Sequence, residues 1–115
     1  MADRNVSPGL HRFIAYFESL RPEDVRAIAQ WYADDAHFRD PFSDVRGTQA
    51  IEAVFARMFT QLDAPRFRIR DVIEGDRQAF LTWDFEFRFR RGDRATTQRI
   101  HGATLLRFDA AGRIR

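Results

Sequence analysis

Between residues 79 and 89, every second side chain is apolar. These apolar residues are Ala79, Leu81, Trp83, Phe85, Phe87 and Phe89. The residues between them include Thr82, Asp84, Glu86 and Arg88, which are polar or charged. Because successive side chains of a β-strand point to opposite faces of the sheet, this alternation predicts a long strand with one buried face and one polar face.

Neighbouring segments show the same period of two. Phe67 and Ile69 alternate with arginines, and turns at Gly75-Asp76 and Gly92-Asp93 separate three strands. The last strand, over residues 95–108, carries Ile100, Thr104, Leu106 and Phe108 on one side and Arg99, His101, Leu105 and Arg107 on the other. Residues 113–115 look like the beginning of a further strand. The second half of the chain is therefore predicted to form an antiparallel meander.

The first half has the 3.6-residue period of helices instead. Ser7 followed by Pro8 predicts a helix start, and Pro22 begins a second helix whose first turn is acidic. A short strand over residues 36–40 and a turn over 41–47 precede a third helix, from about residue 48 to 62. The apolar stripes of the three helices are Leu10, Phe13, Ile14 and Phe17; Val25, Ile28 and either Trp31 or Tyr32; and Ile51, Val54, Phe55, Met58 and Leu62.

Helices followed by antiparallel strands are typical of the α+β class. We expect three N-terminal helices packed on a curved antiparallel (mixed) sheet. A chain of 115 residues suits one domain, and its 44% hydrophobic content with twelve phenylalanines excludes a disordered protein. Because three short helices cannot cover a long bent sheet completely, an apolar pocket between helices and sheet is predicted.

Composition excludes several classes of function. The chain has no cysteine, which rules out a disulfide framework, a thiolate zinc site and a thiol nucleophile. The formal net charge is only +2 and acidic residues lie among the arginines, so we expect no nucleic-acid binding. We find neither a secretion signal nor an apolar run of about 18 residues, and we expect a cytoplasmic protein without membrane contact.

Three stretches carry a family resemblance: YFESLRPEDVRAIAQWYADDAHFRDPF, VRGTQAIEAVFARMF and LRFDAAGRI. Together they resemble the nuclear transport factor 2-like superfamily, the cone-shaped α+β fold of ketosteroid isomerase, and within it the SnoaL-like group of bacterial proteins. The resemblance implies one domain over residues 1–115 that lacks the usual last strand and C-terminal helix. It does not imply one reaction, because this fold carries many chemistries.

The resemblance also suggests catalytic residues. Ketosteroid isomerase uses an Asp base with a Tyr and a protonated Asp as oxyanion donors. Asp40 matches the base and Tyr16 the donor tyrosine, whereas Thr104 stands where the protonated Asp is expected. The inward-facing positions lack the Asp-Arg-Asp set that resemblance to an epoxide hydrolase would need. They also lack the paired histidines of a scytalone dehydratase, because His37 and His101 fall on the opposite side of their strands.

Plainer interpretations of these residues stay open. Asp40 either acts as a general base, buried beside Phe38 and Phe42, or caps the turn that follows it. Tyr16 either donates to a ligand carbonyl or is a core aromatic whose hydroxyl finds any nearby acceptor. The predicted pocket lining is Trp31, Phe38, Phe55, Met58, Trp83, Phe85, Thr104 and Leu106. No grouping of His, Asp or Glu has the spacing of a metal site, and no cofactor is expected.

Three functions compete. The first is a cofactor-free isomerase, dehydratase or cyclase-like lyase for a small, mostly apolar carbonyl compound, with Asp40 moving a proton and Tyr16, helped by Thr104, stabilising the oxyanion. The second is a module that binds such a compound without turnover. The third is an interaction domain whose interior is filled by its own side chains. The mixed charges and apolar spots of the outer sheet face favour a homodimer through that face.

Overall fold

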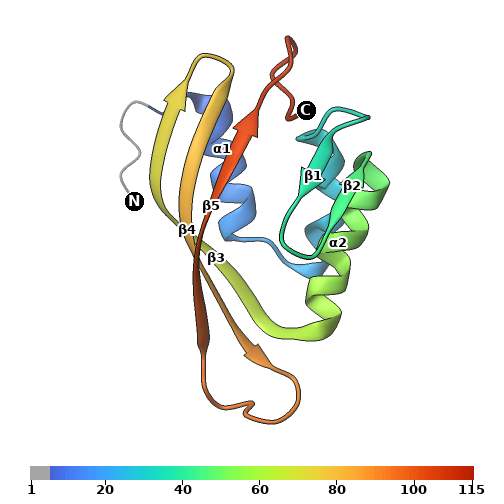
Figure 1. Ribbon diagram of the computed structural model, residues 1–115, viewed down its shortest axis with the longest axis vertical. Coiled ribbons are helices and arrows are strands. Elements are labelled where there is room, and N and C mark those ends of the chain that lie inside the picture. The colour runs from blue at the N-terminus through green and yellow to red at the C-terminus, as the bar shows by residue number, and fades with distance from the viewer. Residues whose placement is uncertain (1–5) are drawn as a thin grey trace.

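The computed structural model describes residues 6–115. In chain order, the elements are α1 (Pro8–Glu18), the 3₁₀ helix η1 (Pro22–Gln30), β1 (His37–Arg39), β2 (Asp44–Arg46), α2 (Thr48–Gln61), β3 (Leu62–Gly75), β4 (Gln78–Phe89) and β5 (Gln98–Arg107). Figure 1 shows β3, β4 and β5 running along the length of the molecule, with α2 beside them. The α+β class predicted from the sequence is confirmed.

The start of α1 follows from its local sequence. The Ser7 hydroxyl accepts a hydrogen bond from the Leu10 backbone N–H (3.4 Å), and Pro8 occupies the first turn, as predicted. Ser7 also donates from its backbone N–H and its hydroxyl to the Glu74 carboxylate near the end of β3 (2.8 and 2.7 Å). The same residue therefore caps the helix and attaches it to the sheet.

The second helical segment, η1, is a 3₁₀ helix. A 3₁₀ helix has three residues per turn, which places Val25 and Ile28 on the same side, and both are buried as predicted. Trp31 and Tyr32 follow the end of this helix. Tyr32 is buried and Trp31 is half-buried, so both contribute to the core.

The third helix is not N-terminal, which corrects one part of the predicted architecture. A two-stranded antiparallel hairpin, β1 with β2, lies between η1 and α2. Phe38 of β1 pairs with Val45 of β2, and both pack partly buried against the core. The turn expected over residues 41–47 therefore contains a strand. At three residues, that strand is too short for a period of two to be recognised in the sequence.

The main sheet has the order β3-β4-β5 and is antiparallel throughout. The last residues extend it slightly, because Ile114 forms an isolated antiparallel bridge with Phe108. Ile114 also forms a parallel bridge with Tyr32. Both bridges lie outside the named strands, and every pair of strands within residues 6–115 is antiparallel.

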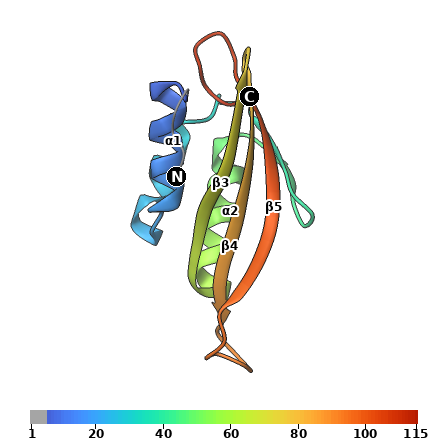
Figure 2. The ribbon, with the colours of Figure 1, turned by 90° about the vertical axis from the view of Figure 1, so that its left-hand side faces the viewer.

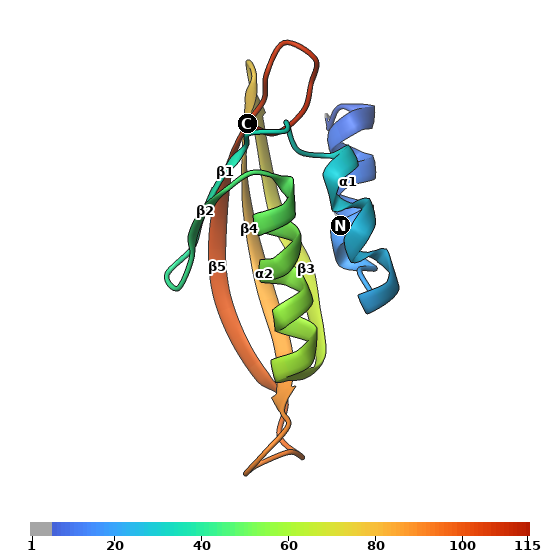
Figure 3. The same ribbon diagram turned by 90° about the vertical axis from the view of Figure 1, so that its right-hand side faces the viewer.

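Both α1 and α2 lie on one side of this sheet, and no described element covers the other side (Figures 2 and 3). We call the covered side the inner face and the other the outer face. On the inner face, Ala79, Leu81 and Leu106 are buried in the core, together with Leu10, Phe13, Ile14 and Phe17 of α1 and Ile51 and Phe55 of α2. Within residues 6–115, none of the helices has the length and hydropathy needed to cross a bilayer.

Candidate functional site

The aromatic side chains of the inner face form one continuous group, which we call the aromatic cluster. Neighbouring ring centroids lead from Trp31 to Tyr16 (5.7 Å), Phe17 (5.3 Å), Phe67 (6.2 Å) and Trp83 (5.6 Å). One branch leads from Phe17 to Phe55 (5.3 Å) and on from Phe55 to Phe38 (5.6 Å), and another leads from Phe67 to Phe85 (4.6 Å). These spacings are typical of favourable aromatic pairs. The fold therefore brings most of the predicted pocket lining together.

The other predicted lining residues adjoin this cluster. Leu106 is buried in the same core, and Met58 of α2 packs against it while half-buried. Thr104 is joined to the cluster by a hydrogen bond, because its hydroxyl accepts from the Trp83 indole N–H (2.9 Å). The register places Thr104 opposite Leu81, two pairs along from Trp83 and Gly102 and so on the same face.

Gly102 determines how Trp83 lies. A Cβ atom at Gly102 would overlap the six-membered ring of Trp83, so the indole lies directly over this glycine. Only a residue without a side chain leaves that space on the inner face of β5. The Trp83 ring can then reach across β5 to Thr104. Sequence reasoning missed this role, although a glycine inside a strand pattern was the available signal.

Trp31 has an unsatisfied polar group. Its indole Nε1 is buried, and no acceptor lies within hydrogen-bond distance among the described residues. A buried donor left without a partner costs about 1–3 kcal/mol. The other tryptophan, Trp83, has its acceptor in Thr104. The Trp31 N–H is therefore the polar group of the aromatic cluster that could receive an acceptor from a ligand.

Tyr16, the predicted donor, is already hydrogen-bonded. Its hydroxyl donates to the Asp24 backbone carbonyl at 2.7 Å. Burial raises the pKa of Tyr16 to about 12, helped by the negative charges of Asp24 and Glu52. The phenol therefore stays protonated near neutral pH and can act as a donor. To bind a ligand, it would first have to release Asp24.

Asp40, the predicted base, makes a turn. Its Oδ1 atom accepts hydrogen bonds from the backbone N–H groups of Phe42 (2.8 Å) and Ser43 (2.7 Å). This is the turn-capping geometry that the sequence left open as one of two interpretations. Phe42 does not bury the carboxylate as expected, because its own side chain is 96% exposed. Asp40 itself is half-buried.

The Asp40 carboxylate keeps one oxygen available. Among residues 6–115, no hydrogen bond or ion pair involves its Oδ2 atom, and none joins Asp40 to Tyr16. The structure thus places the two predicted catalytic residues without a direct contact between them. A substrate acting as a bridge would have to supply that link.

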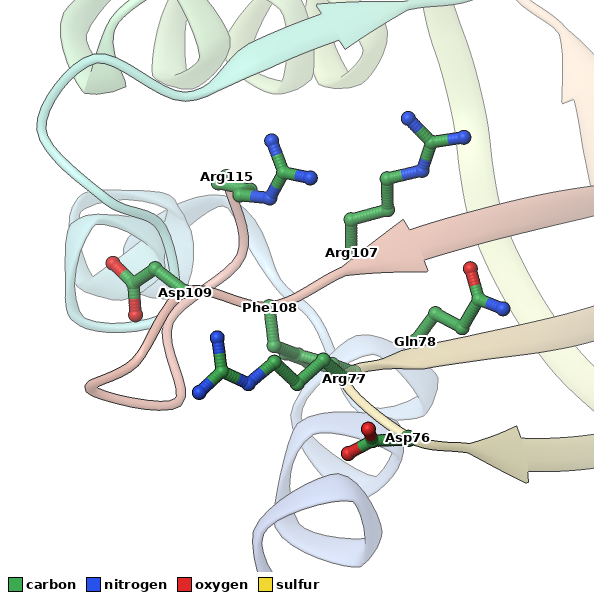
Figure 4. Close-up of a pocket in the computed structure, with 7 residues that line it drawn as sticks. All are labelled: Asp76, Arg77, Gln78, Arg107, Phe108, Asp109 and Arg115. Carbon is green, nitrogen blue, oxygen red and sulfur yellow. The ribbon is translucent and has the colours of Figure 1, made fainter.

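Two hollows on the surface lie away from the aromatic cluster. One, of about 570 Å³, is lined by residues at one end of the sheet (Figure 4). The other, of about 770 Å³, lies at the start of α2 and is lined by residues 46–50 with Asp34. None of the predicted site residues lines either hollow. An enclosed apolar pocket therefore stays a prediction.

The outer face contains a charged network that the sequence did not reveal. Asp84 is only 1% exposed, although it lies on the face that no described helix covers. Arg70 donates to its Oδ2 atom at 2.7 Å, and the His101 ring contacts its Oδ1 atom from the neighbouring strand. Burial alone would raise the pKa of the Asp84 carboxyl, but the hydrogen bond and charge of Arg70, with His101 and Arg99, hold that pKa below its usual range.

Glu86, two residues along β4, has a similar environment. Arg68 donates to its Oε1 atom (3.0 Å) and Arg99 to its Oε2 atom (3.0 Å). The hydrogen bond from Arg68 is the main reason that the pKa of Glu86 is lowered. The predicted placement of Arg99 and His101 on the outer face is confirmed by these contacts.

Comparison with known proteins identifies the type of domain. The sequence model of the SnoaL-like domain matches residues 13–115. A comparison with curated proteins finds no match.

Solved structures share the fold at low sequence identity. A hypothetical protein from Catenulispora acidiphila with a ketosteroid isomerase-like fold, solved with trimethylamine, has a TM-score of 0.77 and 16% identity over 93% of this chain and 79% of that chain. An LEH-like epoxide hydrolase from M. tuberculosis has a TM-score of 0.69 and 15% identity over 92% of this chain and 74% of that chain. A nuclear transport factor 2-like protein of unknown function from Burkholderia pseudomallei has a TM-score of 0.78 and 14% identity, over 95% and 86%. At these identities the likeness establishes the fold.

Proposed function

This chain belongs to the SnoaL-like domain family, and on that premise we propose that it binds a small, mostly apolar carbonyl compound at its aromatic cluster. The observation that carries the proposal is the buried Trp31 N–H without an acceptor. A carbonyl oxygen placed there would complete the hydrogen bonding of the interior, and the surrounding rings would contact the apolar part of the ligand.

Access to this site requires a local rearrangement. The Trp31 Nε1 atom has almost no exposed surface, so a ligand reaches it only when a neighbouring side chain turns aside. Among the half-buried side chains of this core, Met58 is suited to such a movement, because an unbranched thioether changes rotamer readily. Ligand binding would therefore have to open a space among these side chains.

Catalysis is a second candidate, favoured by the unengaged Oδ2 atom of Asp40. That oxygen could take a proton from a carbon next to the ligand carbonyl while Oδ1 keeps its turn contacts. Tyr16 would steady the oxyanion after giving up its bond to Asp24, with Thr104 as a further hydroxyl. The chain would then be a cofactor-free isomerase, dehydratase or cyclase. The alternative is a module that binds without turnover.

The outer face supports a further proposal, that two copies associate there. Ile73, Phe80 and Leu105 stand side by side in the register of β3, β4 and β5, and their exposed fractions are 68%, 43% and 50%. An apolar row of this kind is suited to a contact between identical copies. The cytoplasmic location expected from the sequence stays a prediction.

Binding is tested by titrating the protein with cyclic enones, each paired with the hydrocarbon of the same ring. Trp31→Phe keeps an aromatic ring and removes the indole N–H together with part of the ring surface, and the paired hydrocarbons measure the loss of ring surface separately. We expect it to weaken enone binding about 3- to 10-fold more than hydrocarbon binding, because one hydrogen bond is lost. Trp83→Phe is the matched control, since its N–H is already bonded to Thr104. Equal enone affinity in wild type and Trp31→Phe would contradict the proposal.

Catalysis is tested in the same proteins with β,γ-enones followed by ultraviolet absorbance. Asp40→Asn preserves an oxygen that can accept from Phe42 and Ser43, so the turn is kept while the base is removed. Any isomerisation should fall by about 100-fold or more, without loss of binding. Unchanged turnover would remove Asp40 from the mechanism. Binding without turnover in either protein would establish the non-catalytic module.

A further inference from the structure

The end of the sheet beside the 570 Å³ hollow carries a row of polar side chains. Gln78 of β4 is the register partner of Arg107 of β5. On the other flank of Arg107, the Arg115 backbone N–H donates to its carbonyl at 2.9 Å. Figure 4 shows the side chains of Gln78, Arg107 and Arg115 extending to the same side of the strands. We call these three residues the arginine row.

The arginine row is electrostatically unfavourable by itself. Arg107 ends β5, and the backbone of Arg115 runs beside it next to the isolated bridge between Phe108 and Ile114, an arrangement in which like charges repel. Within residues 6–115, neither guanidinium has a carboxylate partner or a hydrogen bond to any acceptor. By contrast, Arg68, Arg70 and Arg99 on the same face all have carboxylate partners. Two adjacent cations without an anion indicate a place where one can bind.

The nearby carboxylates do not fill this role. The Asp109 Oδ1 atom accepts from the backbone N–H groups of Ala111 and Arg113 (both 2.9 Å), and Figure 4 shows its carboxylate on the far side of Phe108 from Arg107. Asp76, in the β3–β4 turn, makes no ion pair among the described residues, and its side chain lies away from the row (Figure 4). The hollow thus keeps a cationic side.

The rim of the hollow is also strained. Arg77 has φ 58°, a left-handed conformation that a residue with a side chain rarely adopts. It occupies the two-residue turn between β3 and β4, where glycine or asparagine would fit without strain. Strain of this kind is kept most often beside binding sites. The Arg77 side chain adds a third guanidinium to the lining of the hollow.

We propose that the arginine row binds a small oxyanion, a phosphate or carboxylate group, in the hollow at the end of the sheet. Guanidinium groups hold the two oxygens of such a group with paired hydrogen bonds, and the Gln78 amide can donate a further one. Phe108, half-buried at the centre of the lining, supplies an apolar contact for the organic part of the ligand. This site shares no residue with the aromatic cluster and does not depend on the function proposed there.

Binding is measured by calorimetric titration with inorganic phosphate, phenyl phosphate and benzoate, with sodium chloride balancing the ionic strength. Keeping the ionic strength constant with sodium chloride excludes general screening of surface charges as the cause of any binding signal. Arg107→Gln should weaken saturable binding about 10-fold or more. Arg91→Gln makes the same change of charge at an exposed arginine in the β4–β5 loop and should leave binding unchanged. Tighter binding of phenyl phosphate than of inorganic phosphate would show that an organic oxyanion is preferred.

A second variant covers the case in which Arg107→Gln unfolds. Arg115→Gln changes an exposed residue beyond the last strand and should weaken binding by a similar factor while keeping the wild-type circular dichroism. Changes in the NMR chemical shifts of the Gln78 and Arg107 backbone amides on addition of phosphate would show that the ligand binds at the arginine row. Absence of saturable binding of all three probes up to about 20 mM, or an equal loss in Arg91→Gln, would overturn the proposal.

Discussion

A single glycine sets the geometry of the inner face. Because Gly102 has no side chain, the Trp83 indole lies over β5 and its N–H reaches the Thr104 hydroxyl at 2.9 Å. This contact fixes one tryptophan of the aromatic cluster, whereas the N–H of the other, Trp31, has no acceptor. The difference between the two indoles is the residue-level basis of the proposed function.

Gly102→Ala should therefore destabilise the fold. The added methyl group would overlap the Trp83 ring and force it away from Thr104, at a cost of about 1–3 kcal/mol in the free energy of unfolding. Urea denaturation followed by tryptophan fluorescence measures both effects, since the emission of Trp83 should also shift. Gly9→Ala is the matched control, because a Cβ there meets no atom within 4 Å. Equal stability of both variants would show that Trp83 yields freely.

The charged network of the outer face belongs to the level of secondary structure. The register shifts between Ile69 and Asp71, a bulge that lets Arg70 and Asp71 both reach the outer face. Arg70 then covers Asp84, and Asp71 accepts from the Thr82 hydroxyl at 2.8 Å. The bulge thus explains how an acidic residue becomes buried on a face without a helix.

Acid should weaken the fold through Asp84 and Glu86. Both carboxyl groups have lowered pKa values in the folded protein. As the pH falls below about 4, the unfolded chain therefore binds more protons than the folded protein does. Their contribution to stability is present above that pH and is lost as the pH drops through the folded pKa values. In urea denaturation experiments from pH 7 to pH 3, the free energy of unfolding should fall less for Glu86→Gln than for wild type. Glu23→Gln removes an exposed carboxylate on η1, and its free energy of unfolding should depend on pH as that of wild type does. If Glu86→Gln also showed the wild-type dependence on pH, Glu86 would not contribute to the acid sensitivity.

On the scale of the whole molecule, the described helices lie over one face of the sheet and not over the other. The inner face is covered by α1 and α2, while the outer face presents the row of Ile73, Phe80 and Leu105 with no described element over it (Figure 2). This asymmetry leaves an apolar surface that a second copy would cover.

Phe80→Glu should therefore separate two associated copies. Light scattering after size exclusion should give twice the 13.5 kDa chain mass for wild type and the single mass for this variant. The introduced charges would be buried without partners at the contact. Phe42→Glu makes the same substitution at a side chain that is 96% exposed away from the sheet, and it should stay associated. A monomeric wild type at micromolar concentration would contradict the proposed dimer.

Prediction from the sequence succeeded where a pattern extended over many residues. The strand over residues 79–89, the helix starting at Ser7-Pro8 and the third helix from Thr48 all follow from periodicity and capping. β2 was missed because three residues show no period. For Asp40 and Tyr16, the sequence identified candidates without their partners, since the backbone groups that engage them depend on local geometry.

The periods of apolar and polar side chains by themselves determined the α+β class, the two faces of the sheet and the face on which the strand residues of the aromatic cluster lie, because period alone decides which side of an element a residue occupies. Only the tertiary structure decided which polar groups find partners. The bulge that buries Asp84, the glycine under Trp83 and the unpaired N–H of Trp31 arise from contacts between segments distant in the chain, which no local pattern encodes.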